Sequence, residues 1–192
     1  MDDDDARTRL LDAAEALFYA HGVQAVGMDR IRAESQVPLK RLYRLFPAKE
    51  TLVAAYLERR DARWTASLRT HVEAVAEPRE RVAAVFDWLA DWFAQPDFRG
   101  CAFLNTYGEL GEASPEPVLA TIRQHKAALR ALLGEVAAGA ADGADAADLA
   151  DRLLILVEGA TVVASLTPGG AHPTAPAHHA RALAKALLTA GP

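Results

Sequence analysis

The residues with the most suggestive chemistry are the basic ones between positions 30 and 49. This segment holds six basic residues against a single acidic one, although the whole chain carries a formal net charge of −5. Lysine and arginine neutralise phosphates and donate hydrogen bonds to guanine in the major groove, and a tyrosine hydroxyl can reach a phosphate. The segment therefore predicts a local DNA-binding site. The candidate DNA-binding residues are Arg30, Lys40, Arg41, Tyr43, Arg44 and Lys49.

Large aromatic side chains are concentrated in the middle of the chain. Aromatic walls with a few polar groups suit a cavity for an apolar molecule. The same rings fit an ordinary packed core equally well, so both interpretations stay open. The candidate ligand-binding residues are Trp64, Phe86, Leu89, Trp92, Phe93, Phe103, Tyr107, His125 and Thr161.

Two alternative functions belong to other classes. A helical enzyme could use Glu109, His125 or Tyr107 for acid–base chemistry, but the sequence contains no nucleophile elbow, phosphate loop or metal-ligand spacing. The basic segment would also be left unexplained by an enzyme. A sequence-neutral architectural DNA binder would need broad positive charge, whereas this chain is acidic outside one segment. We therefore expect a protein that is not an enzyme.

No metal or cofactor is expected. Cys101 is the single cysteine, so neither an intrachain disulfide nor a multi-cysteine metal site can form. It is interpreted as a small buried hydrophobic residue, because nothing in the sequence indicates a reactive thiolate. His178 and His179 are adjacent, which prevents both imidazoles from facing one side of a helix.

Helical periodicity supplies the elements that must hold these side chains. Apolar residues recur every three or four positions over residues 5–20, which predicts an amphipathic helix closed at Gly22. A second helix of about two turns begins after Gly27, and Pro38 suits the first position of a third helix that ends near Leu45. Two short helices joined by a tight turn, with basic residues on the second, are typical of a helix-turn-helix.

The rest of the chain is also expected to be helical. Ala, Leu, Arg and Glu dominate the composition, so no strand is predicted. The expected fold is all-α with about nine helices. Residues 1–47 are predicted to form a three-helix DNA-binding domain, and residues 48–192 a helical ligand-binding and dimerisation domain. The later helices are predicted at residues 48–73, 78–94, 101–111, 115–138, 145–166 and 175–190.

Residues at fixed spacing indicate a family. The chain has Gly22, Met28–Ile31, Val37, Leu42–Arg44, Phe46–Pro47, Lys49–Glu50 and Leu52. This pattern, over roughly residues 7–54, resembles the N-terminal domain of the TetR (tetracycline repressor) family. The segment from Arg99 to Phe103 resembles one subgroup of that family's ligand-binding domains. The resemblance implies a regulator, in most cases a repressor, that a small, largely apolar molecule releases from a palindromic operator. It also implies a recognition helix carrying Lys40, Arg41, Tyr43 and Arg44.

The chain departs from the family pattern at three positions. Gln36 stands where the family usually has a turn glycine, Gly27 replaces a usual Ser or Thr cap, and Ala48 replaces a usual Ser. A glutamine in a left-handed conformation would cost roughly 1 kcal/mol relative to glycine. The two missing hydroxyls remove two potential phosphate contacts.

Two stripes of small and aliphatic residues, along residues 145–166 and 175–190, predict a dimer interface. As in the family, two such helices from each of two subunits would form a four-helix interface. The two-fold symmetry would place two recognition helices in successive major grooves, about 34 to 36 Å apart. The candidate interface residues are Leu149, Leu153, Leu156, Ala160, Val163, Ala180, Leu183 and Leu187.

The expected partners are double-stranded operator DNA, a second copy of the chain and a small-molecule effector. The acidic start of the chain does not resemble a signal peptide, and no uncharged apolar run is long enough to span a membrane. We expect a cytoplasmic protein with no membrane partner.

Overall fold

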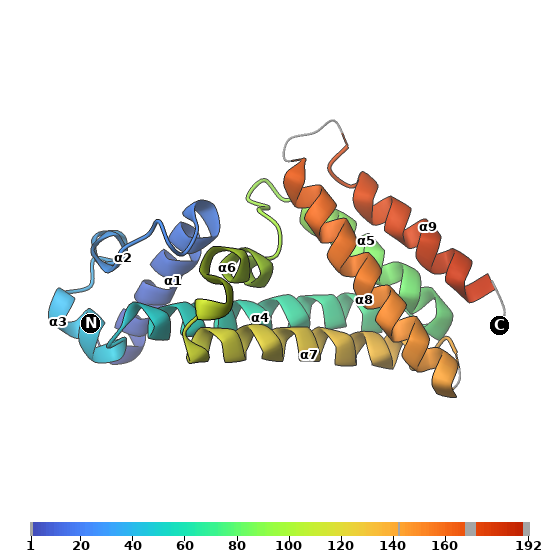
Figure 1. Ribbon diagram of the computed structural model, residues 1–192, viewed down its shortest axis with the longest axis horizontal. Helices are drawn as coiled ribbons and strands as arrows, with labels where there is room; N and C mark the ends of the chain where they lie inside the picture. Colours follow the sequence, from blue (N-terminus) through green and yellow to red (C-terminus); the bar gives the residue numbers. More distant parts are fainter. Residues whose placement is uncertain (1, 142, 168–171, 190–192) are drawn as a thin grey trace. The chain divides into compact units, whose positions relative to one another are not determined.

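The described part of the chain is helical throughout. The computed structural model describes residues 2–141, 143–167 and 172–189 (Figure 1). These residues form nine α-helices, two short 3-10 helices and no strand, which confirms the all-α prediction. None of the helices in these ranges has the length and apolarity that a membrane crossing requires. The elements are α1 (Asp3–His21), α2 (Met28–Ser35), α3 (Leu39–Leu45), α4 (Lys49–Glu73), η1 (Pro78–Glu80), α5 (Arg81–Phe93), α6 (Ala102–Leu110), η2 (Gly111–Ala113), α7 (Glu116–Ala138), α8 (Gly143–Leu166) and α9 (Ala175–Thr189).

The chain forms two compact units, and each unit combines two segments that are separate in the sequence. The first comprises Met1–Arg63 and Ala102–His125, and the second comprises Trp64–Cys101 and Lys126–Pro192. Helices α4 and α7 are each divided between the two units. The predicted DNA-binding domain, residues 1–47, lies wholly within the first unit, which also contains α6. The predicted boundary between a DNA-binding and a ligand-binding domain stays a prediction about function.

Helix α1 is stabilised at both ends by local interactions. The Asp2 carboxylate accepts a hydrogen bond from the Asp5 amide at 2.8 Å, which satisfies one of the free N–H groups at the helix start. The acidic first turn also suits the positive end of the helix dipole. At the other end, Gly22 adopts a φ of 86°, which a glycine takes without steric cost. Between these caps, Leu10 and Phe18 are buried, as the apolar periodicity predicts.

Helices α2 and α3 both pack against α1 and enclose a small core. Ile31 of α2 and Leu42 of α3 are fully buried, and Phe46, directly after α3, is nearly so. Leu42 and Phe46 therefore both point inward, into this core. The buried Val37 lies in the turn between the two helices. Its amide donates a hydrogen bond to the Ser35 hydroxyl at 3.3 Å. The sequence therefore builds a helix-turn-helix on a closed apolar core.

The turn of this motif needs a left-handed residue, and Gln36 supplies it. Gln36 has a φ of 56° and a ψ of 23°. Within the described ranges it is the one non-glycine residue with a positive φ. This confirms the left-handed conformation that the missing turn glycine led us to expect, and glutamine carries a steric cost there that glycine does not.

Replacing Gln36 with glycine is expected to stabilise the protein by about 1 kcal/mol, because the left-handed strain disappears. Chemical denaturation of the wild type and Gln36→Gly measures the difference in the free energy of unfolding. Ala33→Gly, at an exposed site of ordinary helical geometry in α2, is the matched control and should be destabilising. A loss of stability in Gln36→Gly as large as that in the control would contradict the strain.

In the second unit, α5 packs against α8 and α9 (Figure 1). Phe86 and Leu153 are fully buried in this core. Beside them, the ring of Trp64 from α4 meets those of Trp88 and Trp92 from α5 edge-on, with centroids 4.9 and 5.6 Å apart. Such edge-to-face pairs add to the stabilisation that burial alone provides. Much of the aromatic content predicted for the middle of the chain is therefore packed in this unit.

Candidate nucleic-acid interface

Helix α3 turns its basic residues to solvent because the opposite side of the helix, at Leu42, faces the core. Leu42 is the one buried residue of this short helix. Lys40, Tyr43 and Arg44 are exposed, and Arg41 is half-buried. The structure thus brings four of the predicted DNA-binding residues together on one helix.

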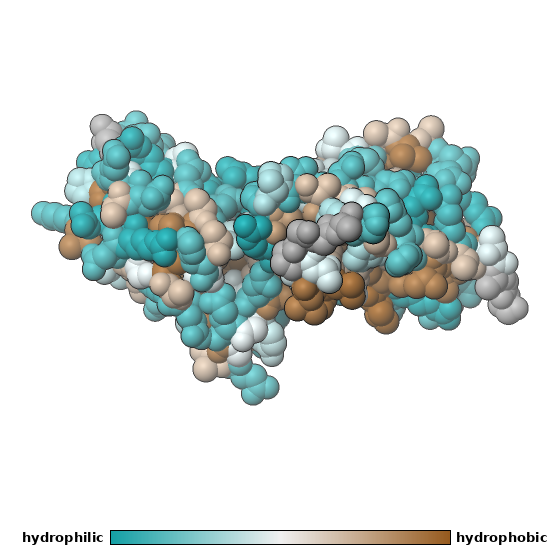
Figure 2. Space-filling model, turned by 90° about the horizontal axis from the view of Figure 1, so that it is seen from above, coloured by the Kyte–Doolittle hydropathy of each residue, from teal (hydrophilic) through white to brown (hydrophobic). Residues whose placement is uncertain are grey.

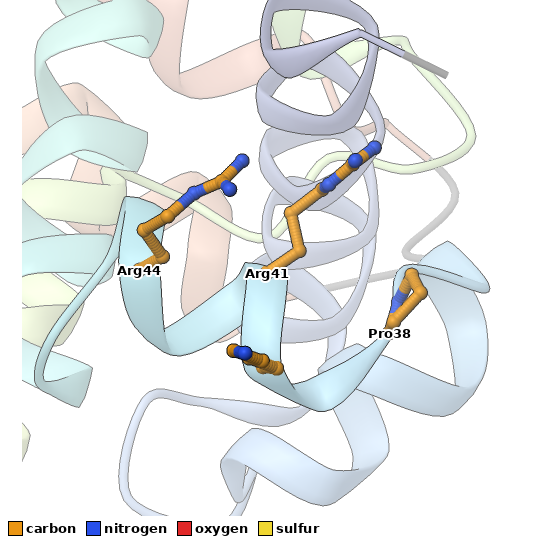
Figure 3. Close-up of a pocket in the computed structure, with 4 residues that line it drawn as sticks. Pro38, Arg41 and Arg44 are labelled. Atoms are coloured by element: carbon orange, nitrogen blue, oxygen red, sulfur yellow. The ribbon is translucent and has the colours of Figure 1, made fainter.

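An open pocket of about 650 Å³ lies along the start of α3, lined by Pro38, Lys40, Arg41 and Arg44. Figure 3 shows Arg41 and Arg44 extending from α3 toward the same side, with Pro38 at the start of the helix. Guanidinium groups present planar forks of N–H donors that match phosphate oxygens and the guanine edge. The pocket therefore suits an anion or the edge of a base.

An acidic residue from α1 already lies among these arginines. The Arg44 guanidinium donates a hydrogen bond to Oδ1 of Asp3, and the same oxygen lies 3.8 Å from Nε of Arg41. This contact was not predicted from the sequence. Charge is the signal that could have indicated it, because an acidic turn and a basic segment in one small unit attract each other.

The other two predicted DNA-binding residues lie on neighbouring elements of the same unit. Lys49 begins α4, as predicted, and its Nζ donates to the backbone carbonyl of Gln24 at 3.5 Å. Backbone amides at a helix start favour an anion, so a phosphate near Lys49 would meet both the amides and the ammonium. Arg30 is exposed on α2. Lys49 is half-buried, and a role for either side chain in DNA binding stays a prediction.

Known proteins share this arrangement. Residues 10–56 match the model of the bacterial regulatory proteins of the tetR family. The crystal structure of a TetR-family transcriptional regulator from Streptomyces coelicolor superposes with a TM-score of 0.86, at 32% sequence identity, over 96% of this chain and 89% of that one. The chain belongs to the TetR family. It is a DNA-binding transcriptional regulator, and the TetR family consists of regulators rather than enzymes.

Two mycobacterial regulators are also similar over part of their length. An HTH-type transcriptional regulator of Mycobacterium tuberculosis is 35% identical over 77 residues, which are 40% of this chain and 38% of that protein. The HTH-type transcriptional activator FasR of Mycolicibacterium smegmatis is 31% identical over 106 residues, which are 54% of this chain and 48% of that protein. The chain thus spans less than half the length of the curated relatives that it matches.

TetR regulators respond to small-molecule effectors, and the residues predicted to bind one fall into both compact units. The first unit holds Phe103, Tyr107 and His125. The remaining six lie in the second unit. They are Trp64, Phe86, Leu89, Trp92, Phe93 and Thr161.

In the first unit, His125 is buried in a polar and aromatic contact. Its Nδ1 lies 2.7 Å from Oδ1 of Asp61, and its ring stacks on Phe103 with centroids 3.6 Å apart and planes 6° apart. Asp61 was not predicted, because nothing local marks a partner 64 residues away. Tyr107 of α6 is exposed instead. His125 and Asp61 do not belong to a cluster that could hold a metal ion, since no group of three metal-binding side chains occurs among the described residues.

In the second unit, the predicted ligand residues belong to the packed core or lie against it. Phe86, Leu89 and Phe93 are buried, and Trp64 and Trp92 are half-buried beside them. Thr161 is also buried. Its hydroxyl donates to the carbonyl of Val157 at 2.8 Å, one turn earlier in α8. The hydroxyl is therefore satisfied within its own helix, and a role toward a ligand stays a prediction for all six.

A contact absent from the predictions joins α6 to the helix-turn-helix. The Gln24 amide donates to Oε2 of Glu109 at 2.7 Å, and the Gln24 side-chain amide donates to the backbone carbonyl of Glu109. Gly22 makes room for this carboxylate, because a Cβ at that position would lie 2.8 Å from Oε1 of Glu109. Glu109, weighed earlier as an acid–base group, is instead bound to the connection between α1 and α2.

The predicted dimer residues lie at different depths of the second unit. Leu149, Leu153, Ala160 and Ala180 are buried within their own subunit, and Leu156 and Leu187 are half-buried. Val163 and Leu183 are exposed, as are three apolar residues of α8 that were not predicted. Figure 2 shows apolar residues, in brown, gathering along one edge of the surface. We define the α8–α9 apolar face as Ile155, Val162, Val163, Leu166 and Leu183.

Proposed function

We propose that two copies of this TetR-family chain bind a palindromic operator through α3, and that a small, largely apolar molecule releases them. The observation that carries the proposal is the basic, solvent-facing side of α3 on a buried helix-turn-helix core. Lys40 and Arg44 can donate to guanine or phosphate, and the exposed Tyr43 hydroxyl can donate to a phosphate. Base contacts supply sequence preference, and phosphate contacts supply affinity.

The α8–α9 apolar face supports the two-copy arrangement. Ile155 is 70% exposed and Leu166 is 76% exposed, which is unusual for large aliphatic side chains. Contiguous exposed apolar residues mark interaction surfaces, and a two-fold interface uses the same patch from both copies. A two-fold related pair of recognition helices can read two half-sites in successive major grooves.

The Glu109 contact supports the response to an effector. Phe103 and Tyr107 lie on α6 together with Glu109. A ligand seated beside these two rings would shift Glu109 and, through Gln24, the connection that leads into α2. Release of DNA follows if the ligand binds better to the shifted arrangement than to the DNA-binding one.

The DNA-binding part is tested by titrating the protein with the DNA upstream of its own coding region, in the presence and absence of nonspecific competitor DNA. We expect binding to survive the competitor and to protect a palindromic segment from nuclease. With an architectural binder, the competitor would displace the upstream DNA. An enzyme would bind neither the upstream DNA nor the competitor DNA. Either result would reject the proposal.

An effector that releases the DNA is expected to bind the DNA-bound protein more weakly than the free protein, by the same factor by which it weakens DNA binding. Once a screen for DNA release has supplied a compound, calorimetric titration with and without operator DNA measures both affinities. Equal ligand affinities in the two titrations would reject the switch while leaving the DNA-binding function intact. A reporter gene under the operator then distinguishes repression from activation.

A further inference from the structure

The carboxylate of Asp3 occupies the arginines that α3 would use for DNA. It accepts a hydrogen bond from Arg44 and lies 3.8 Å from Nε of Arg41. Both arginines line the open pocket of α3, together with Pro38 and Lys40. The contact crosses from the first turn of α1 to the recognition helix. Asp2 already caps α1.

A carboxylate and a phosphate compete for the same donors. Both present oxygens that match the planar fork of a guanidinium, and arginine binds either of them. The side chains of Asp3 and Arg44 are 55% and 58% exposed, so water screens this ion pair and it can open readily. The geometry thus describes a contact that an incoming phosphate can replace.

We propose that Asp3 is an internal competitor for DNA phosphate, which holds Arg41 and Arg44 in the free protein and must leave them when α3 contacts DNA. This inference rests on the proposed function. When DNA binds, a phosphate replaces the Asp3 carboxylate as the partner of Arg41 and Arg44. Breaking the ion pairs with Asp3 offsets part of the electrostatic attraction between these arginines and DNA. The carboxylate thereby lowers the affinity of α3 for phosphate.

The test compares Asp3→Asn with Asp4→Asn. Both substitutions remove one exposed carboxylate from the first turn of α1, so they change the net charge and the interaction with the helix dipole equally. The ion pairs with Arg41 and Arg44 are made by Asp3. The full-length proteins are titrated with a short mixed-sequence DNA duplex at several salt concentrations.

We expect Asp3→Asn to bind the duplex about 3- to 10-fold more tightly than Asp4→Asn at low salt, since the ion pairs of Asp3 with Arg41 and Arg44 no longer oppose binding. The difference should shrink as salt rises and screens the charges. Asp3→Glu keeps a carboxylate within reach of the arginines and should bind like the wild type. Thermal unfolding of each variant confirms that the compared proteins are folded.

Equal affinities for Asp3→Asn and Asp4→Asn would overturn the competitor role and leave the proposed function standing. Tight binding by Asp3→Glu, equal to that of Asp3→Asn, would also overturn it, because the carboxylate would then be irrelevant. An absence of salt-dependent binding in the wild type and in every variant would reject the proposed function and this inference together.

Discussion

Replacing Ile155 with glutamate is expected to convert the proposed dimer into monomers and to weaken operator binding at least about 100-fold. The side chain is 70% exposed in the single chain, so a charge there leaves the subunit core intact. In a two-fold interface each glutamate would be buried against apolar residues without a partner for its charge, which is strongly unfavourable. A monomer engages one half-site, and the gain from two linked half-sites disappears.

Sedimentation at micromolar concentration measures the oligomeric state, and titration with operator DNA measures the affinity for that DNA. Ala127→Glu adds the same charge at an exposed position of α7 and should leave both unchanged. Leu153→Glu, at a fully buried position of α8, should instead lower the unfolding temperature of the subunit. A wild type that sediments as a monomer, or an Ile155→Glu variant that remains dimeric, would remove the α8–α9 apolar face from the interface.

Replacing Lys40 with alanine is expected to relax the sequence preference at one operator position by about 1 to 3 kcal/mol, or roughly 5- to 150-fold. Lys40 is exposed near the start of α3, the end of a recognition helix that usually meets the bases. Lys49→Ala is expected to weaken all sequences alike, because a lysine at the start of α4 contacts phosphate rather than a base edge.

Selection from a random duplex library first defines the operator of the wild type. Each variant is then titrated with the operator and with its single-base changes. Arg123→Ala removes the same charge from an exposed site of α7 and serves as the control for net charge. If Lys40→Ala and Lys49→Ala both bind every duplex as the wild type does, α3 and the start of α4 are not the DNA-binding surface.

The helix-turn-helix could be predicted from the sequence because its signals are local. Pro38 fixes the start of α3, and the spacing of Leu42 and Phe46 assigns the inward face before any long-range contact is known. The left-handed Gln36 was suggested by the family resemblance instead, because the family usually has a turn glycine at this position. The exposed basic side of α3 then follows by exclusion.

The contacts of Asp3 and Glu109 could not be predicted in this way. Arg44 lies 41 residues from Asp3, and Glu109 lies 85 residues from Gln24. Periodicity shows which face of a helix is apolar. It does not show which other element will contact that face or the polar residues beside it. Both contacts depend on how helices distant in sequence pack together in the first unit.

The dimer stripe on α8 shows a different limit. Leu153 and Ile155 are both apolar and only two positions apart, yet Leu153 is buried in its own subunit and Ile155 is exposed. A helix with two apolar sides gives a pattern that does not say which side faces its own core. The predicted residues Leu149 and Leu153 follow the inner side, and the outer side emerges only once α5 and α9 are in place.

The Glu109 contact bears on how this regulator could be recombined with others. A chimeric regulator can be designed by exchanging a DNA-reading module at a boundary drawn along the sequence. A cut after residue 47 would leave Gln24 without the carboxylate and the carbonyl of Glu109 to which it donates hydrogen bonds. The transplantable module in this protein is therefore discontinuous, and a graft that reads its DNA faithfully has to carry α6 along with α1, α2 and α3.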